Sequence, residues 1–547
     1  MSDSCARHHD LPIFEIQQPS SLPVGKYQPY VPVGLADRTW PDRVQRRAPI
    51  WCSVDLRDGN QALLEPMSMA SRQEMFRLLV RMGFKEIEVG MPVSCRADAE
   101  FLRWLVRSDA VPDDVTVQVL VPMRPELIVE TVNMLWGLRR AVLQVFHPAS
   151  PAQRRMVLGL SREEMLRLAV AGADLAMRLR DGMPCEILLQ YAPESFTQTE
   201  PEYALDLCNA VLERWQPTAA DGVRVNLPAT VETFPPHEFA DRIEWFHRRL
   251  AFRDKVLLSV HPHNDRGTAV AAAESAVLAG ADRVEGTLFG NGERSGNVCL
   301  VTLAMNLFSQ GVDPMLELGD LDDIRRTVAR CTKMPIGPRQ PWAGELVYTS
   351  LAGSHQDAIA KGLRERERSG QPCWEVPYLA IDPHDIGRDY QALIRLSNQS
   401  GKGGLAYVMR ADHNVDLPRG VQIELAEAAK REMDEGRDLD SGGVWSLFER
   451  QYLRQASAEL EASVAVGSCQ PDDLVAMVSH RLGCPARLVD LVEQPRGAET
   501  VCFCQVACGT VTRWGVGIAA TKQRARLSAV YSGLVRLAAA SVRDRAS

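Results

Sequence analysis

The feature that most constrains the fold is a regular alternation of apolar runs and amphipathic stretches that begins at Trp51. Short apolar runs are typical of buried strands, and the stretches between them, such as 75–82 and 162–179, have helical periodicity. The eight runs are 51–54, 86–89, 116–121, 141–146, 186–189, 223–226, 256–260 and 283–285. Eight strand–helix units over roughly 250 residues predict an α/β fold, a (β/α)₈ TIM barrel. A doubly wound open sheet is the alternative, but it normally has fewer strands and a glycine-rich first turn.

The sequence predicts three further parts besides the barrel, which is assigned to residues 46–330. Residues 1–45 are rich in Pro, Gln and Ser and are expected to form an N-terminal arm. Residues 331–435 are predicted to form helical linker subdomains. After a linker rich in Asp and Gly, residues 444–547 predict a small α+β domain of regulatory type, with strands at 459–466 and 500–507 and helices at 472–482 and 523–540.

Composition excludes several classes of protein. The net charge of -8 argues against a nucleic-acid partner, because such proteins usually have basic domains. No run approaches the roughly 18 apolar residues of a membrane helix, and the N-terminus lacks the apolar core of a signal peptide. The thirteen cysteines include no C-x-x-C pair, and Cys502, Cys504 and Cys508 are expected to be buried free thiols. A cytoplasmic location is therefore expected.

The sequence His261-Pro262-His263 directly follows the apolar run 256–260. Side chains two apart on a strand point the same way, so both imidazoles can face one point past the carboxyl end of this strand. Neutral imidazoles in that arrangement are good ligands for a divalent metal. The alternative is a pair of histidines at a strand end with no metal.

A second polar group follows the first predicted strand, at Arg57 and Asp58. Barrel enzymes have their sites at the carboxyl ends of the strands, so Asp58 is expected close to the two histidines. One carboxylate with two imidazoles suits Mg²⁺, with Mn²⁺ or Zn²⁺ as alternatives. Arg57 can place a guanidinium over a developing oxyanion. A local salt bridge between Arg57 and Asp58 is the alternative.

Three motifs carry a resemblance to a known family. Ser-Val-Asp-Leu-Arg-Asp-Gly-Asn-Gln at 53–61, His-Pro-His-Asn-Asp at 261–265 and Gly-Asn-Gly-Glu-Arg-Ser-Gly-Asn-Val at 290–298 resemble signatures of the 2-isopropylmalate synthases. That family belongs to the aldolase-like (DRE-TIM metallolyase) barrels. Matching segments continue through 353–362, 374–378 and 400–404, so the whole chain is similar to the longer, actinobacterial-style branch.

The resemblance implies an acyltransferase that performs a metal-dependent Claisen condensation of acetyl-CoA with 2-oxoisovalerate. The products would be 2-isopropylmalate and CoA, in the first committed step of leucine biosynthesis. Carried over to this chain, Asn297 joins Asp58, His261 and His263 in or near the metal's coordination sphere. The implied catalytic residues are Arg57, Glu194, His355 and Tyr390, and the implied substrate-binding residues are Asn226, Thr230 and Glu293. His355 and Tyr390 have ordinary helix or interface positions as their alternative.

The departures from the family pattern lie at the carboxyl ends of the predicted strands. Gln144 stands where the family usually has a histidine, so Gln144 is expected to face the substrate. Other departures are Met91-Pro-Val-Ser94, Val121-Pro-Met-Arg124 and Ala192. They indicate either neutral drift or an altered 2-oxo acid specificity in a specialised pathway.

The resemblance also extends to the C-terminal part, which is similar to the family's leucine-binding feedback domain. The turn at 466–473 replaces the family's glycine- and asparagine-rich turn, which leaves leucine inhibition open. A homodimer is expected, because in the family the segment after the barrel crosses to the other subunit.

Four functions therefore compete at this point: condensation with 2-oxoisovalerate, the same condensation on another 2-oxo acid, a related carbon–carbon lyase, and a sensor of a small acid. The long C-terminal part favours a synthase over a lyase, and the Arg57–Asp58 pair with the two histidines argues against a mere sensor.

Overall fold

A computed structural model describes residues 20–350, 352–390, 402–434, 439, 441–453, 470–482 and 485–544. The chain divides into two compact units, Met1–Leu316 with Arg330–Lys333, and Glu317–Ala329 with Met334–Ser547. The predicted strand at 459–466 and part of the predicted linker at 436–443 lie outside the described residues.

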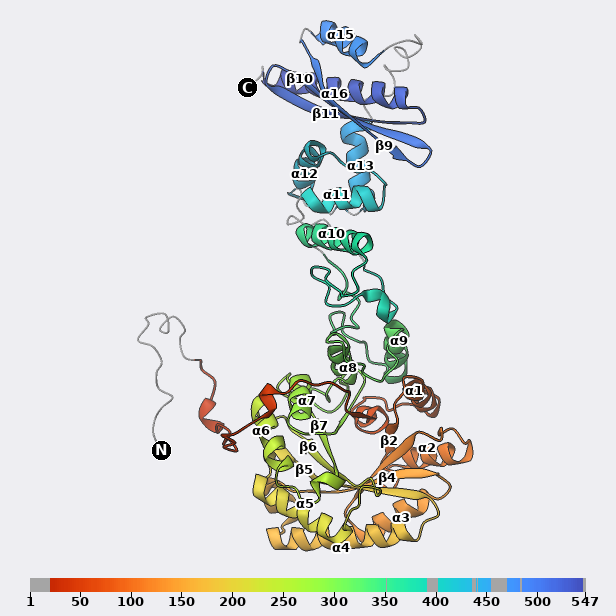
Figure 1. Cartoon of the computed structure of the whole chain (residues 1–547), viewed down its shortest axis with the longest axis vertical. Helices are drawn as coiled ribbons and strands as arrows, with labels where there is room; N and C mark the ends of the chain where they lie inside the picture. Colours follow the sequence, from red (N-terminus) through yellow and green to blue (C-terminus); the bar gives the residue numbers. More distant parts are fainter. Residues whose placement is uncertain are drawn as a thin grey trace, which may run out of the picture. The chain divides into compact units, whose positions relative to one another are not determined.

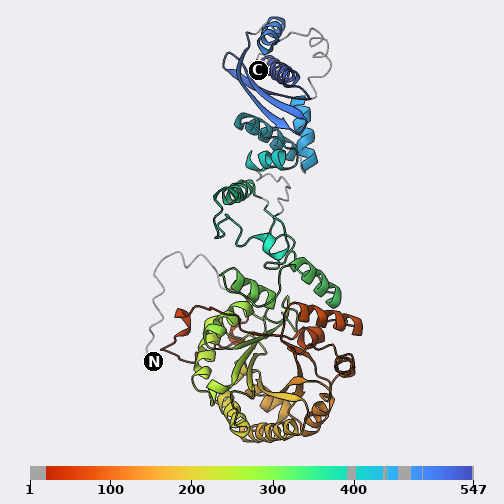
Figure 2. The ribbon, with the colours of Figure 1, turned by 45° about the vertical axis from the view of Figure 1, so that its right-hand side comes forward.

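The first unit contains a closed barrel of eight parallel strands in sequence order, as predicted. The barrel closes where β1 pairs with β8, in a register that includes Ile50 opposite Arg283. This closure excludes the open sheet. Figures 1 and 2 show the strands enclosed by a ring of helices. The strands are β1 (Ile50–Ser53), β2 (Glu86–Gly90), β3 (Thr116–Pro122), β4 (Arg140–Pro148), β5 (Glu186–Glu194), β6 (Arg224–Ala229), β7 (Leu257–Pro262) and β8 (Arg283–Gly286).

The barrel helices begin and end at residues that suit helix termini. Ser161 caps α4 (Arg162–Asp181) in a capping box with Glu164, and Pro201 and Pro236 open α5 (Pro201–Trp215) and α6 (Pro236–His247). The others are α1 (Met69–Arg81), α2 (Arg96–Arg107), α3 (Pro125–Met134), α7 (Ala269–Leu278) and α8 (Leu300–Phe308), with α9 (Leu321–Thr332) after them. Short turns at Asp55–Gly59 (η4) and Gln153–Leu158 (η5) follow β1 and β4.

The interior of the barrel contains two layers of polar side chains, which is unusual because barrel interiors are mostly filled by branched apolar residues. In the lower layer Glu86 accepts hydrogen bonds from Arg224 and from Arg283, the latter at 2.6 Å. The upper layer lies nearer the carboxyl ends of the strands and contains Glu88, Gln118, Gln144, Gln190, Asn226 and Glu285, all buried. These side chains support the site described below.

The described part of the predicted N-terminal arm lies against α6. Three carboxylates of this helix bind it: Glu238 accepts the backbone N–H of Val33 at 3.0 Å, Asp241 accepts the indole N–H of Trp40 at 2.7 Å, and Glu244 binds Thr39. The arm is therefore attached to the outside of the barrel by specific hydrogen bonds.

The second unit contains helices and one antiparallel sheet in the order β11-β10-β9. Helix α16 packs on this sheet (Figure 1). Its elements are α10 (Gly353–Ser369), η8 (Pro383–Ile386), α11 (Lys402–Ala411), α12 (Arg419–Asp434), α13 (Ser441–Phe448), η9 (Glu449–Leu453), α15 (Pro471–Leu482), β9 (Arg487–Arg496), β10 (Glu499–Cys508), β11 (Val511–Ala519) and α16 (Lys522–Asp544). The α+β character expected for the C-terminal part is confirmed.

Two further expectations concern the cysteines and membranes. Cys502 and Cys504 are buried free thiols, as predicted, but Cys508 forms a disulfide, so the prediction was wrong for that residue. Among the described helices, none combines the length and apolar character that crossing a membrane requires.

Candidate metal centre and substrate cavity

A cavity of about 240 Å³ opens at the carboxyl ends of the barrel strands. This is the end of the barrel where residues from different strands converge. Both charged and apolar side chains form its walls, which suits a small polar ligand with an apolar portion. The lining residues are Arg57, Asp58, Gln61, Met91, Leu120, Gln144, Phe146, Ala192, Glu194, Asn226, Pro228, Thr230, His261, His263, Glu293 and Arg294.

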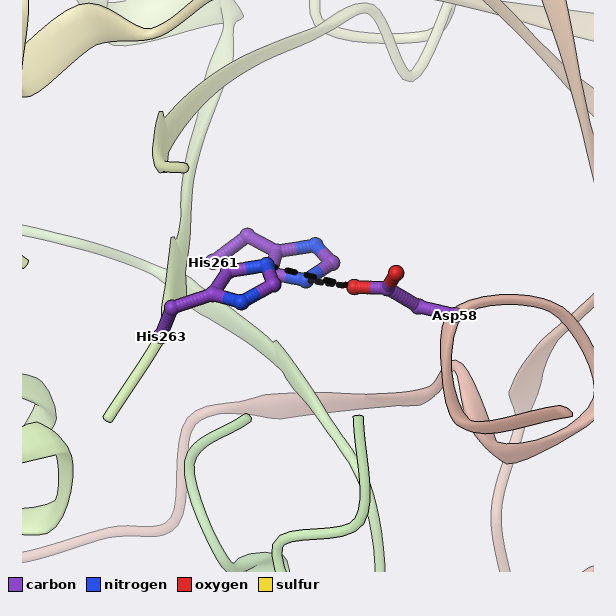
Figure 3. Close-up of side chains that lie close together, drawn as sticks. All are labelled: Asp58, His261 and His263. Atoms are coloured by element: carbon purple, nitrogen blue, oxygen red, sulfur yellow. Dashed lines mark hydrogen bonds and ion pairs between the residues drawn. The ribbon is translucent and has the colours of Figure 1, made fainter. Parts of the chain in front are cut away.

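One wall of the cavity brings together Asp58, His261 and His263 (Figure 3). The Oδ2 atom of Asp58 lies 3.0 Å from Nε2 of His261 and 3.3 Å from Nε2 of His263. The two imidazoles are stacked, with ring centroids 5.4 Å apart. Asp58 comes from the turn after β1, and the histidines come from the end of β7, so closure of the barrel joins them.

The hydrogen bonds around His261 show that this group suits a cation. Nδ1 of His261 lies 2.8 Å from a carboxylate oxygen of Glu285, which can only accept, so Nδ1 carries the proton. Nε2 then faces two more acceptors, Asp58 and the amide oxygen of Asn297 at 2.7 Å. Nε2 of His261, the carboxylate of Asp58 and the amide oxygen of Asn297 are thus three acceptors that face one another, and such a group needs a positive charge between its members. Burial lowers the pKa of the imidazole, but Asp58 and Glu285 raise it to about 10, so the surrounding carboxylates favour a positive charge at this point.

Asn297 is positioned by a tight loop after β8. Its backbone N–H donates to Gly290 at 3.0 Å, and its side-chain N–H donates to Asn291 at 3.1 Å, which leaves the amide oxygen facing His261. Gly296 has a φ of +93°, and a Cβ there would lie 1.8 Å from the carbonyl oxygen of Gly290. The loop therefore requires glycine at 296 to place Asn297.

Arg57 lies between two carboxylates. Its Nε donates to Glu88, and Nη1 lies 3.1 Å from Asp58. The pKa of Asp58 falls well below its usual range, because Arg57 and the two histidines outweigh the effect of burial. The local salt bridge is confirmed, and Arg57 also lines the cavity, so its role at an oxyanion stays a prediction.

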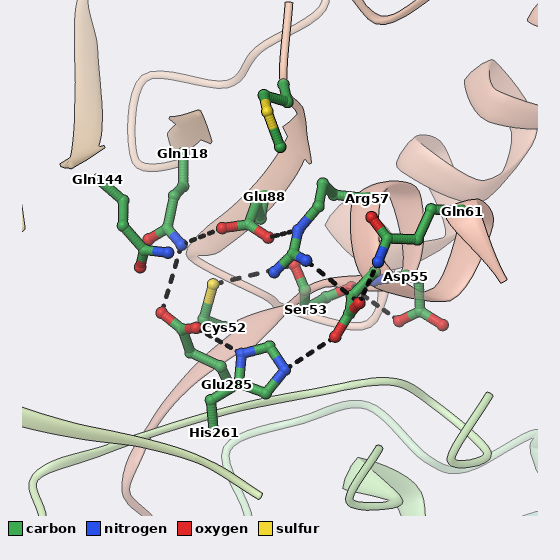
Figure 4. A network of polar contacts seen from close by, with 12 residues as sticks. Cys52, Ser53, Asp55, Arg57, Gln61, Glu88, Gln118, Gln144, His261 and Glu285 are labelled. Carbon is green, nitrogen blue, oxygen red and sulfur yellow. Dashed lines mark hydrogen bonds and ion pairs between the residues drawn. The ribbon is translucent and has the colours of Figure 1, made fainter. Parts of the chain in front are cut away.

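Glu285, which is next to the candidate metal centre, accepts hydrogen bonds from five side chains, and Figure 4 shows those from His261 and Gln118. Besides His261 these are Arg283, Gln118, Gln190 and Asn226. Arg283 holds the pKa of Glu285 below its usual value, although burial would raise it. Glu285 thus holds the ring of His261 in one orientation, as outer-shell carboxylates do at metal sites.

Of the substrate residues predicted from the sequence, Gln144, Asn226, Thr230 and Glu293 all line the cavity, and so does Glu194. Burial raises the pKa of Glu194, partly opposed by Arg57. The hydroxyl of Thr230 accepts the backbone N–H of Ser195 at 2.9 Å.

His355 and Tyr390 belong to the second unit. His355 is an exposed residue of α10, and its ring stacks on Tyr378 with centroids 4.0 Å apart. Tyr390 is half-buried beyond η8. The roles predicted for them at the active site therefore stay predictions.

Sequence reasoning missed the supporting layer of Glu88, Gln118, Gln190 and Glu285. A signal was present, because a Gln or Glu within an otherwise apolar strand is rarely buried without a partner. Met91 belongs to one of the departures named from the sequence, whereas the apolar lining residues Leu120 and Phe146 were missed, since periodicity alone does not separate core from cavity wall.

Comparison with known proteins identifies the family to which the chain belongs. The HMGL-like family profile matches residues 48–328, and the profile named alpha-isopropylmalate synthase, post-catalytic domain-like, matches residues 345–410. A 2-isopropylmalate synthase of Parafrankia sp. (strain EAN1pec) is 49% identical over 559 residues, covering 95% of this chain and 98% of the relative. The chain belongs to the 2-isopropylmalate synthase family. It is therefore an enzyme, an acyltransferase.

Two other 2-isopropylmalate synthases support this membership. The protein of Ralstonia nicotianae (strain ATCC BAA-1114 / GMI1000) is 45% identical, covering 94% of this chain and 95% of the relative. That of Thermobifida fusca (strain YX) is 50% identical over 80% of this chain and 79% of its own. The similarity thus extends beyond the barrel into the second unit.

Proposed function

We propose that the chain catalyses the metal-dependent condensation of acetyl-CoA with a 2-oxo acid. The family's name makes 2-oxoisovalerate the first acid to test, with 2-isopropylmalate and CoA as products. The observation that carries the proposal is the group of Asp58, His261, His263 and Asn297 beside Arg57 in one cavity. One carboxylate, two imidazoles and an amide oxygen suit Mg²⁺, with Mn²⁺ or Zn²⁺ as alternatives.

In the reaction, a methyl C–H bond of acetyl-CoA breaks and the new C–C bond forms at the keto carbon, whose oxygen becomes a hydroxyl. Water then cleaves the thioester and releases CoA as the thiol. When bound, the metal supplies a Lewis acid and a template for the oxo acid. Arg57, held by Glu88 and Asp58, is oriented to stabilise negative charge on the former keto oxygen.

Proton transfer is assigned to residues with suitable chemistry. Glu194 lies in the cavity, and burial moves its pKa towards neutrality, which suits a group that takes and returns a proton. Asn226, Thr230 and Glu293 are proposed to hold the substrate. His355 and Tyr390, which belong to the second unit, are proposed to take part in proton transfer. In a homodimer, each subunit would present these two residues to the cavity of its partner.

The test is thiol release from acetyl-CoA by the purified protein with Mg²⁺ or Mn²⁺ and a panel of 2-oxo acids. His263→Ala is expected to lose metal-dependent turnover while keeping its fold, because the variant lacks one ligand. His384→Ala changes an exposed histidine of the second unit and is the control. Wild-type turnover in His263→Ala would contradict the metal assignment.

A lyase of the same barrel type, cleaving a 3-hydroxy acyl thioester, is the second candidate. The match of the post-catalytic profile to residues 345–410 favours the synthase. Thiol release that depends on an added 2-oxo acid separates the two. Feedback by leucine through the C-terminal part is tested in the same assay by adding leucine.

A further inference from the structure

Three amide side chains, those of Gln144, Gln190 and Asn226, are hydrogen-bonded to one another next to Glu285, and Gln144 and Asn226 also line the cavity. Nε2 of Gln190 donates to Glu285 at 2.8 Å, and Nδ2 of Asn226 donates to it at 2.9 Å. A carboxylate can only accept, so the NH₂ groups of Gln190 and Asn226 must face it. Glu285 thereby determines the orientation of both amides, which an amide without such a partner would leave undecided.

The orientation of Gln144 follows from the other two. The NH₂ groups of Gln190 and Asn226 also donate to the carbonyl oxygen of Gln144, the latter at 3.4 Å. The NH₂ group of Gln144 must therefore point away from them. It has no acceptor among the described residues, although Gln144 is only 4% exposed and lines the cavity. Because Gln144 lines the cavity, a ligand bound there can supply the acceptor that the described residues do not provide.

None of the described side chains of the cavity wall accepts a hydrogen bond from this NH₂ group. The remaining wall includes the apolar side chains of Met91, Leu120, Phe146 and Ala192, which offer no oxygen or nitrogen to the ligand. The amide oxygen of Asn226 is also buried and has no donor among the described residues. An oxygen atom of the ligand, in a hydroxyl or a carbonyl group, can accept from Gln144.

Charge further restricts which group of the ligand can be this acceptor. Two buried carboxylates, Glu88 and Glu285, lie in the same polar layer as the amides and are paired with Arg57 and Arg283. These two cations are therefore already engaged, so a further carboxylate on the side chain of the ligand would need a new positive charge, whereas a neutral oxygen would not.

We infer that the 2-oxo acid taken by this chain bears a neutral oxygen, a hydroxyl or a carbonyl, on its side chain, and that Gln144 selects for it. The inference rests on the proposed condensation and changes only the side chain of the acid. 2-Oxoisovalerate has only methyl groups to offer Gln144, so it is expected to be the weaker substrate.

The experiment compares acids of matched shape. One pair is 4-hydroxy-2-oxobutanoate and 2-oxopentanoate, and the longer pair is 5-hydroxy-2-oxopentanoate and 2-oxohexanoate. In thiol release with Mg²⁺, the hydroxylated acid is expected to have a kcat/KM at least about tenfold higher in one pair, since a site with an unpaired donor discriminates against an alkyl group. Equal values, or a preference for the alkyl acid in both pairs, would overturn the inference.

Gln144→Met keeps the side-chain volume but removes the donor, and it is expected to reduce the preference for the hydroxyl at least about tenfold. Leu120→Met alters the same cavity without touching the donor and should change both members of a pair alike. A preference that survives in a folded Gln144→Met would overturn the role of Gln144.

Calorimetric binding of the same acids to the Mg²⁺-loaded wild-type protein, without acetyl-CoA, separates the two proposals. Tighter binding of the hydroxylated acid without any thiol release would support the selectivity and overturn the condensation. Thiol release with a preference for the alkyl acids would support the condensation and overturn the selectivity. Neither release nor binding would overturn both.

Discussion

Glu285 is the residue on which the geometry of the metal centre depends most. Glu285 is not one of the proposed metal ligands, but it accepts the Nδ1–H of His261 at 2.8 Å. It therefore keeps Nε2 of His261 facing Asp58 and Asn297. A carboxylate in this role also raises the basicity of the imidazole ligand. The same carboxylate orients Gln190 and Asn226, so one buried side chain supports both the metal centre and the amide side chains next to it.

Glu285→Gln is therefore expected to weaken the binding of Mn²⁺ by about 10- to 100-fold, the usual effect of losing an outer-shell partner. Calorimetric titration of the purified protein measures it. Glu86→Gln is the matched control, because Glu86 is also a buried carboxylate bonded to Arg283 but lies one layer lower. Equal Mn²⁺ affinities in the two folded variants would contradict the positioning role of Glu285.

The loop from Gly290 to Asn297 is the element that completes the centre. It passes close to itself at Gly296, where a Cβ would lie 1.8 Å from the carbonyl oxygen of Gly290. Backbone atoms cannot move aside as a flexible side chain can, so any side chain at 296 must displace the loop and, with it, Asn297.

Gly296→Ala is expected to lower Mn²⁺ affinity as well as stability. Gly311→Ala is the control: Gly311 also has a positive φ, +74°, but a Cβ there meets nothing within 4 Å. Both variants pay the backbone strain of about 1 kcal/mol, so a difference in Mn²⁺ affinity isolates the steric effect. The same affinity in both would show that the loop tolerates the displacement.

The turn η5 after β4 is attached to α5 by an ion pair. Arg154, which is buried, binds Glu200 through two hydrogen bonds of 3.0 and 2.8 Å, and Arg162 adds a third at 2.6 Å. Burial opposes the shift, but Arg154 and Arg162 lower the pKa of Glu200 from 4.5 to about 2. Because the folded-state pKa is lower, the ion pair stabilises the fold above about pH 4.5 and is lost as the pH falls towards 2.

Glu200→Gln is expected to lower the Tm at neutral pH and to flatten its decline between pH 5 and 3, because a group that titrates there is gone. Thermal unfolding followed across that range measures both effects. Glu202→Gln, on the same turn of α5, is the control. Parallel curves for wild type and Glu200→Gln would count against the ion pair as a source of acid sensitivity.

At the scale of the whole molecule, the second unit has hydrophobic core clusters of its own. In the second unit, β11 and α16 approach so closely that a Cβ at Gly515 would lie 2.1 Å from the carbonyl oxygen of Ala529 and 2.2 Å from the backbone nitrogen of Gly533. This contact involves backbone on both sides and is remote in sequence from every proposed metal ligand.

Gly515→Ala is expected to destabilise the second unit by about 1–3 kcal/mol, as overpacking does, and to leave Mn²⁺ binding by the barrel unchanged. Calorimetric unfolding with a parallel Mn²⁺ titration measures both. Gly337→Ala is the control, because Gly337 also lies in the second unit without a positive φ and a Cβ there meets nothing within 4 Å. A loss of Mn²⁺ affinity in Gly515→Ala would mean that the units are energetically coupled.

Much of the fold was readable from the sequence, because it depends on local patterns. Alternating apolar runs and helical stretches predicted eight strands that all exist, although β4, β5 and β6 extend further at their carboxyl ends than the apolar runs do. The spacing of His261 and His263 on one strand likewise predicted that they share a direction, and their rings are stacked.

Only the tertiary structure decided which distant groups meet and which way they face. Closure of the barrel brings Asp58 from β1 within 3.0 Å of His261 from β7, and it makes Glu285 a common acceptor for side chains of five strands. The direction of the Gln144 amide follows from that acceptor and from nothing in its own sequence neighbourhood. Residue type and periodicity determine which side chains lie inside the barrel, whereas hydrogen-bond direction depends on the partners that the closed sheet supplies.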